Sequence, residues 1–167
     1  NYLIDNILDR SSQKGTGIDF AICSLRYGIP TPTIIAAINA RFISYSEYRK
    51  NNVYLHEGIN LYQDHSEISS MLFDSVYCSY IVAIFQGLSL IQKVSKVKSW
   101  DIDLMKVISV WEEGCIIKAS VFKELCKYLD NGLVVDILFK ELTVEKIENL
   151  SKVVRLGARS SIPLPVF

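Results

Sequence analysis

The segment Gln13-Lys14-Gly15-Thr16-Gly17 carries the residue types that a phosphate-binding loop requires. Lys14 supplies a mobile positive charge and Thr16 a hydroxyl, while the glycines allow backbone N–H groups to approach a ligand closely. An apolar helical pattern follows, and the start of a helix adds unpaired N–H donors and the positive end of its dipole. The spacing differs from the Walker pattern, in which Lys and then Ser or Thr follow the second glycine. A phosphate cradle is one interpretation of this segment, and an ordinary glycine-rich helix connector is the other.

A second cation is expected to reach this loop from the next helical pattern. Residues 18–27 read as one helix, which ends at Gly28 and the turn Ile29-Pro30-Thr31-Pro32, and a second periodic run contains Arg41. A helix rises about 1.5 Å per residue, so roughly ten residues up and nine back return Arg41 to the level of Lys14. Each charge-assisted hydrogen bond from these two side chains to a phosphate monoester would contribute about 1.5–3 kcal/mol. A solvent-exposed or salt-bridged helix residue is the alternative reading of Arg41.

Apolar residues recur at helical spacing through most of the chain, and no stretch sustains the alternation typical of a strand. The pattern predicts helices near residues 1–10, 18–27, 32–48, 66–97, 102–112, 116–130 and 144–158, with 50–65 as the one sizeable loop. Asp101 and Thr143 are the expected N-caps of two of these helices, and Gly132 is an expected terminator. The chain therefore reads as a single all-α domain over residues 1–167.

Composition and charge exclude several classes of function. With 167 residues and 50% hydrophobic content, the chain can bury a substantial core. The net charge is zero, which leaves no basic surplus for nucleic-acid binding, and the cluster Lys93, Lys96 and Lys98 reads as a solvated helix end. The apolar run Ile81–Ile91 is interrupted by Gln86 and is shorter than the roughly 20 residues of a membrane span. We therefore expect a buried core helix there, and no nucleic-acid or membrane partner.

The residue types that bind metals show no spacing typical of a metal site. His56 and His65 have no companion motif and read as loop residues. The cysteines lack paired ligand spacing, so we expect reduced cytosolic thiols rather than a disulfide framework or a zinc site; they are Cys23, Cys78, Cys115 and Cys126. No signal-peptide pattern is visible.

Two turns in the chain resemble each other. Residues 27–32 and residues 160–165 each follow a helix and each end in Ile-Pro-x-Pro. A duplicated helical unit would explain this similarity. The alternative is that Pro-x-Pro after a helix is simply a common stop signal.

Further landmarks follow the glycine-rich segment in order along nearly the whole chain. They are Ile7-Leu8-Asp9 before residues 13–17, residues 27–32 and then Ala40-Arg41, Ser79 with Gln86-Gly87, Trp111 with Gly114-Cys115-Ile116-Ile117-Lys118, and Ile162-Pro163-Leu164-Pro165. Together they resemble the C-terminal helical domain of the decarboxylating 6-phosphogluconate dehydrogenases, in which Ser79 and Gln86-Gly87 match a long central helix. The family's helical domain is likewise built from a repeated helical unit.

The resemblance implies a function and a set of site residues. Lys14 and Thr16 match the positions that hold the 6-phosphate of the substrate, and Arg41 matches the arginine that completes this clamp. The family oxidises and decarboxylates 6-phosphogluconate, a phosphorylated sugar acid, with NADP as cofactor in the cytoplasm, and it forms homodimers. The chain has no Gly-x-Gly-x-x-Gly fingerprint, so it reads as an excerpt that lacks the NADP-binding domain and its catalytic lysine and glutamate. We therefore expect the fragment alone to be inactive, and we read Trp111 and Gly114 as packing residues.

The sequence departs from the family pattern at several positions. Ile18 and Asp19 replace a basic residue and a tryptophan, and the other departures are Tyr80, Glu112, Glu113 and Lys118. An acid near the cradle lowers the local potential, although it also stabilises a helix N-terminus. Two other readings stay open: a related β-hydroxyacid dehydrogenase with a different substrate, and a helical dimerisation module without catalysis.

Overall fold

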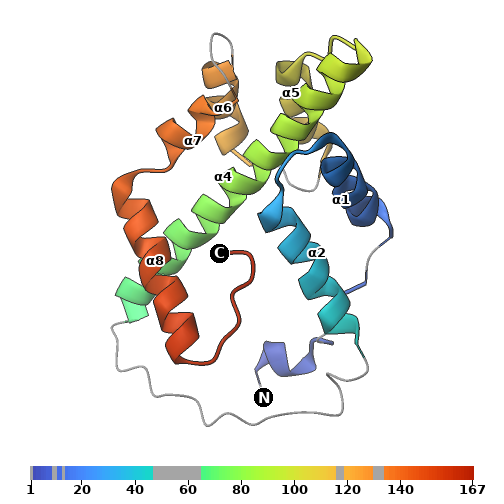
Figure 1. Ribbon diagram of the computed structural model, residues 1–167. Coiled ribbons are helices and arrows are strands. Elements are labelled where there is room, and N and C mark those ends of the chain that lie inside the picture. The colour runs from blue at the N-terminus through green and yellow to red at the C-terminus, as the bar shows by residue number, and fades with distance from the viewer. Residues whose placement is uncertain (1, 9–10, 13, 47–64, 116–118, 130–133) are drawn as a thin grey trace.

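The computed structural model describes residues 2–8, 11–12, 14–46, 65–115, 119–129 and 134–167 (Figure 1). These residues form a short 3-10 helix, η1 (Leu3–Asn6), and the helices α1 (Thr16–Tyr27), α2 (Pro32–Tyr45), α4 (His65–Lys98), α5 (Leu104–Gly114), α6 (Val121–Leu129), α7 (Asp136–Glu141) and α8 (Val144–Arg159). No strand occurs among them. The prediction of an all-α fold with one long helix is therefore confirmed.

The 34-residue helix α4 is the centre of the fold. It contacts α1, α2, α5, α7 and α8. In Figure 1, α8 lies along the first part of α4, α5 lies near its C-terminal end, and the hairpin of α1 and α2 lies on the other side. The segment that leads into α1 lies beside the last turns of α2, where Ser11 forms hydrogen bonds with Ser44 and Arg41.

The hydrophobic core lies between α4 and the helices α5, α6 and α7. Phe122 of α6 is fully buried, and the rings of Tyr80 and Trp111 pack on it with centroid separations of 6.3 and 6.2 Å. The other buried members of this cluster are Ile81, Ile84, Leu88, Ile108, Leu125, Val134 and Ile137. The prediction that Ile81–Ile91 belongs to a buried core helix is confirmed. By length and composition alone, residues 66–98 are also long and apolar enough to cross a membrane. In this fold, the buried face of α4 packs against the neighbouring helices.

Several predicted helix boundaries were wrong. Near residues 1–10, the described part contains only the 3-10 helix η1, and α2 ends at Tyr45 rather than at residue 48. The helix predicted from residue 116 begins at Val121, and the sequence pattern missed α7 because six residues are too few to show a helical period. Gly132 and nearly all of the predicted loop 50–65 lie outside the described residues.

The predicted cap at Asp101 was also wrong. Asp101 has φ 51°, in the left-handed region, and therefore belongs to the turn that leaves α4. Asp103 caps α5 instead, because its extended backbone lets the carboxylate accept hydrogen bonds from the N–H groups of Met105 (2.9 Å) and Lys106 (3.4 Å). The predicted cap at Thr143 is confirmed by its hydrogen bond from the N–H of Lys146.

The two similar turns share their backbone geometry. Gly28 (φ 67°) ends α1, and the N–H of Ile29 donates to the carbonyl of Ser24 at 2.9 Å. Ser161 (φ 55°) has the same place after α8, and the N–H of Ile162 donates to the carbonyl of Gly157 at 2.8 Å. This is a common way for a helix to end, so a duplicated helical unit and a shared stop signal would both produce it.

Candidate phosphate-binding pocket

The glycine-rich segment ends in an uncapped helix start. Gly15 occupies the N-cap position of α1 with φ 101° and ψ −29°, and no side chain of the described residues caps the helix there. A Cβ at Gly15 would meet no atom within 4 Å, so the backbone conformation, rather than crowding, favours glycine. The first turn of α1 therefore keeps N–H groups available for an anion, and the helix dipole favours negative charge at this end.

Hydrogen bonds to α1 and to α4 fix the position of α2. In the turn between α1 and α2, the buried hydroxyls of Thr31 and Ser24 form a hydrogen bond of 3.0 Å. From α4, the buried Gln86 donates to the hydroxyl of Thr33 (3.2 Å) and accepts from the N–H of Ile34 (3.4 Å). These bonds hold the start of α2 against both α1 and α4, and α2 then runs back toward the start of α1.

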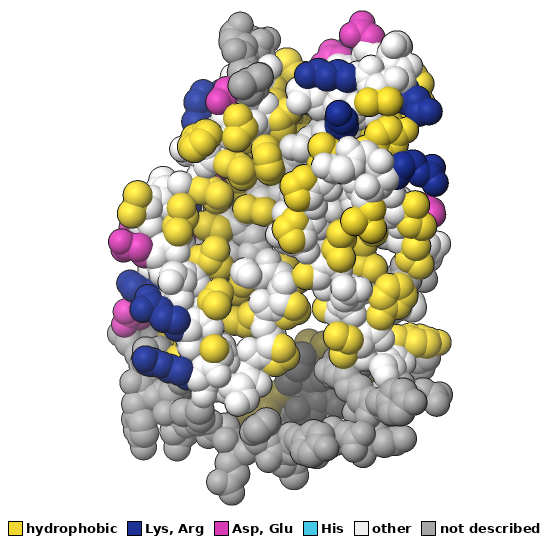
Figure 2. Space-filling view, viewed as in Figure 1, with side chains coloured by type: hydrophobic (Ala, Val, Ile, Leu, Met, Phe, Trp, Pro, Cys, Tyr) yellow, Lys and Arg dark blue, Asp and Glu magenta, His cyan; other side chains and the backbone are white. Residues whose placement is uncertain are grey.

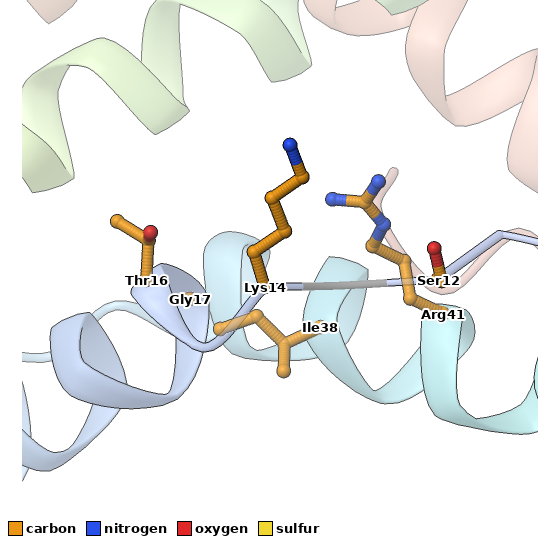
Figure 3. A pocket seen from close by; sticks show the side chains of 6 residues that line it. All are labelled: Ser12, Lys14, Thr16, Gly17, Ile38 and Arg41. Atoms are coloured by element: carbon orange, nitrogen blue, oxygen red, sulfur yellow. The ribbon is translucent and has the colours of Figure 1, made fainter.

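A pocket of about 450 Å³ lies where the end of α2 meets the glycine-rich segment. Its lining comprises Ser12, Lys14, Thr16, Gly17, Ile38 and Arg41 (Figure 3). The ammonium of Lys14 and the guanidinium of Arg41 extend toward the same side in Figure 3. The structure thus brings together Lys14, Thr16 and Arg41, as the sequence predicted.

The pocket is electrostatically suited to an anion. None of its lining residues is acidic, and neither Lys14 nor Arg41 forms an ion pair among the described residues. Asp19, one turn into α1, lines a different pocket, an apolar one of about 440 Å³ between α1, α4 and α5. The acid that departs from the family pattern therefore lies beside the cradle and not in its lining.

Two serines that precede the cradle also belong to this region, and the sequence pattern did not single them out. Ser12 lines the pocket, and Ser11 accepts a hydrogen bond of 3.0 Å from Nε of Arg41. Two adjacent hydroxyls before a glycine-rich segment were the available signal. Their proximity to Arg41, 30 positions further along the chain, depends on the return of α2.

The remaining residues of interest lie away from this pocket. Trp111 packs on Phe122, which agrees with its predicted packing role, and Tyr80 belongs to the same aromatic cluster. Glu112 lies 3.6 Å from the ammonium of Lys123 in an ion pair between α5 and α6. Gly114 is exposed at the end of α5. The departure at Lys118 and the residue His56 lie outside the described residues.

The described residues contain no group of three or more His, Cys, Asp or Glu side chains that could hold a metal ion. In the same part of the chain the cysteines are all free thiols. Burial is the main cause that raises the pKa of Cys78 and of Cys126. Neither thiol is therefore activated as a nucleophile.

Comparison with known proteins places this helical arrangement in a family. The model of the 6-phosphogluconate dehydrogenase C-terminal domain matches residues 1–167. The chain belongs to this family. Among relatives, it is 30% identical to the decarboxylating 6-phosphogluconate dehydrogenase of Lactococcus lactis subsp. lactis (strain IL1403) and 30% identical to that of Staphylococcus aureus (strain N315). Each match covers 99% of this chain and 37% of the relative.

A solved structure of Plasmodium falciparum 6-phosphogluconate dehydrogenase is similar to this chain with a TM-score of 0.80 and 30% identity. The match covers 99% of this chain and 38% of that one. That protein was described in its apo form, with NADP+ and with 6-phosphogluconate. The 6-phosphogluconate dehydrogenase family assignment and the expected all-helical C-terminal domain are thus confirmed, while the chain spans little more than a third of its relatives' length.

Proposed function

We propose that the protein to which this chain belongs is an NADP-dependent dehydrogenase that oxidatively decarboxylates 6-phosphogluconate to ribulose 5-phosphate, a reaction of the pentose phosphate pathway. The chain's own contribution is the clamp for the 6-phosphate. The observation that supports this proposal best is the convergence of Lys14, Thr16 and Arg41 on one pocket without an acidic lining residue, in a member of this family.

The chemistry assigns a role to each side chain of the clamp. Lys14 acts as a mobile point charge, and the guanidinium of Arg41 can donate two parallel hydrogen bonds to phosphate oxygens. The hydroxyl of Thr16 and the free N–H groups of the first turn of α1 complete the set of donors. Binding energy from this remote phosphate orients the C3 hydroxyl for oxidation and the C1 carboxylate for loss as carbon dioxide.

NADP would supply the hydride acceptor for this oxidation. The 167 residues contain no Gly-x-Gly-x-x-Gly fingerprint, so we assign the binding of NADP to a part of the enzyme outside this chain. We therefore expect no catalytic residue within the chain, and the chain by itself should not turn over substrate.

We also propose that the enzyme is a cytoplasmic homodimer, and the exposed apolar surface supports the dimer. Phe73 and Val76 of α4 are 70% and 56% exposed, and Phe139 of α7 is 80% exposed. Only 28% of the most apolar stretch of α4 is buried within the chain. Figure 2 shows hydrophobic side chains over much of the visible face, with several Lys and Arg side chains toward its margins. In sedimentation of the complete protein, Phe73→Asp should shift a wild-type dimer toward monomer, and a wild-type monomer at high concentration would refute the dimer.

The proposed activity is tested by the substrate preference of the complete protein. We expect NADPH formation with 6-phosphogluconate and a much larger KM for gluconate, which lacks the phosphate. Equal use of gluconate, or preference for another hydroxy acid, would instead identify a related β-hydroxyacid dehydrogenase. Absence of turnover, together with absence of a nucleotide-binding βαβ pattern in the complete gene, would identify a helical module without catalysis.

A further inference from the structure

We propose that Ser11 is a positioning residue that directs the Arg41 guanidinium into the phosphate pocket. This inference rests on the proposed function, because it assigns to Ser11 a role in binding the same phosphate. Ser11 itself does not line that pocket, so it acts through Arg41 and does not touch the ligand.

The contacts join the segment before the cradle to the last turn of α2. Nε of Arg41 donates to the hydroxyl of Ser11 at 3.0 Å. The backbone N–H of Ser11 donates to the hydroxyl of Ser44 at 3.1 Å. That hydroxyl in turn donates to the backbone carbonyl of Arg41 at 2.9 Å, with the carbonyl of Ser11 as a longer alternative at 3.4 Å. Ser44 therefore anchors Ser11 to α2 one turn beyond Arg41.

This geometry leaves the terminal N–H groups of the Arg41 guanidinium available to a ligand. A guanidinium has five N–H donors in one plane, and an acceptor at Nε fixes the orientation of that plane while the four terminal N–H groups remain available. An unrestrained arginine loses rotamer entropy when it is immobilised. A hydrogen bond made before the ligand arrives removes part of that cost from binding.

A second pocket explains why the orientation needs control. It has a volume of about 290 Å³, shares Ser12 and Arg41 with the phosphate pocket, and is lined also by Ser11, Phe42 and Tyr45. Arg41 lines both pockets and is exposed, so its guanidinium could turn toward either. The aromatic rings of the second pocket offer a surface on which a guanidinium can stack. The hydrogen bond from Nε to Ser11 fixes the plane of the guanidinium, and in Figure 3 its terminal nitrogens lie on the same side as the ammonium of Lys14.

A double-mutant cycle in the complete protein tests this role. Ser11→Ala should raise KM for 6-phosphogluconate, and the inhibition constant of inorganic phosphate, about 2- to 10-fold, the equivalent of one ordinary hydrogen bond, while kcat changes less than about twofold. In an Arg41→Ala background, Ser11→Ala should have no further effect, because the group that it orients is gone. Ser11→Thr keeps the hydroxyl and should restore binding. Ser109→Ala is the matched control, since among the described residues that hydroxyl donates to the carbonyl of Lys106 on α5, away from the pocket.

The outcomes separate the two proposals. If Arg41→Ala leaves KM unchanged, the phosphate clamp itself is refuted. If Arg41→Ala raises KM but Ser11→Ala does not, the clamp stands and the role of Ser11 is refuted. A full additional effect of Ser11→Ala in the Arg41→Ala background would also refute it, because Ser11 would then act independently of the arginine.

Discussion

Replacement of Lys14 by methionine removes the ammonium from the phosphate pocket and keeps most of the apolar stem. The Lys14 side chain is exposed and has no ion-pair partner among the described residues. Phosphate binding therefore replaces its hydrogen bonds to water and breaks no ion pair within the described residues. A charge-assisted hydrogen bond contributes about 1.5–3 kcal/mol, and solvent screening at an exposed site lowers this to about 1–2 kcal/mol. We therefore expect KM for 6-phosphogluconate to rise about 5- to 30-fold.

The assay is the initial rate of NADPH formation by the complete protein at saturating NADP. The effect of Lys14→Met on KM should shrink as salt is raised, because the Debye length falls from about 10 Å at 0.1 M to about 3 Å at 1 M. KM for gluconate should be unchanged, since gluconate has no phosphate for Lys14 to bind. Lys106→Met, which removes an exposed cation on α5, is the matched control. An equal rise in KM for both substrates would show that Lys14 supports the fold or another substrate group, and an unchanged KM would refute the cradle.

Further predictions concern the stability of the helical domain. Phe122→Ala empties the fully buried centre of the aromatic cluster and should lower the free energy of unfolding by about 3–5 kcal/mol in denaturant titrations. Asp103→Ala should cost about 0.5–2 kcal/mol through loss of the α5 cap, and an unchanged stability would contradict our cap assignment. Burial raises the pKa of Cys78 above its ordinary 9.0, and burial and the hydrogen bond to a carboxylate raise the pKa of Tyr77 above 10.0. Both groups stay neutral in the folded state, so stability should be complete below about pH 9 and fall above it as the unfolded groups ionise. Tyr77→Phe should make that fall shallower in melting curves, and an unchanged slope would count against a buried phenol.

Features that depend on neighbours in sequence were predictable. The periodicity of residues 18–27, 66–97 and 144–158 identified α1, α4 and α8 nearly to their ends, because an amphipathic or buried helix of that length repeats its pattern several times. Short elements were not predictable. The six residues of α7 contain fewer than two turns, and Asp101 and Asp103 are equally good caps by residue type. The backbone angles of Asp101 and Asp103 determine which of the two caps α5, and these angles depend on how the chain leaves α4.

The sequence by itself determined that the chain is helical, that a glycine-rich segment with Lys14 and Thr16 precedes a helix, and that α2 returns Arg41 toward it. Each of these follows from local rules: helical period, the left-handed preference of glycine and the fixed rise of a helix. Only the tertiary structure decided how Arg41 is held. Ser11 and Ser44 meet 33 positions apart because Gln86 of α4 and the Thr31–Ser24 hydrogen bond fix the angle of the hairpin. Sequence spacing constrains the distance along a helix. It does not determine which hydroxyl of a neighbouring segment faces Arg41, because that choice depends on how α1, α2 and α4 pack together.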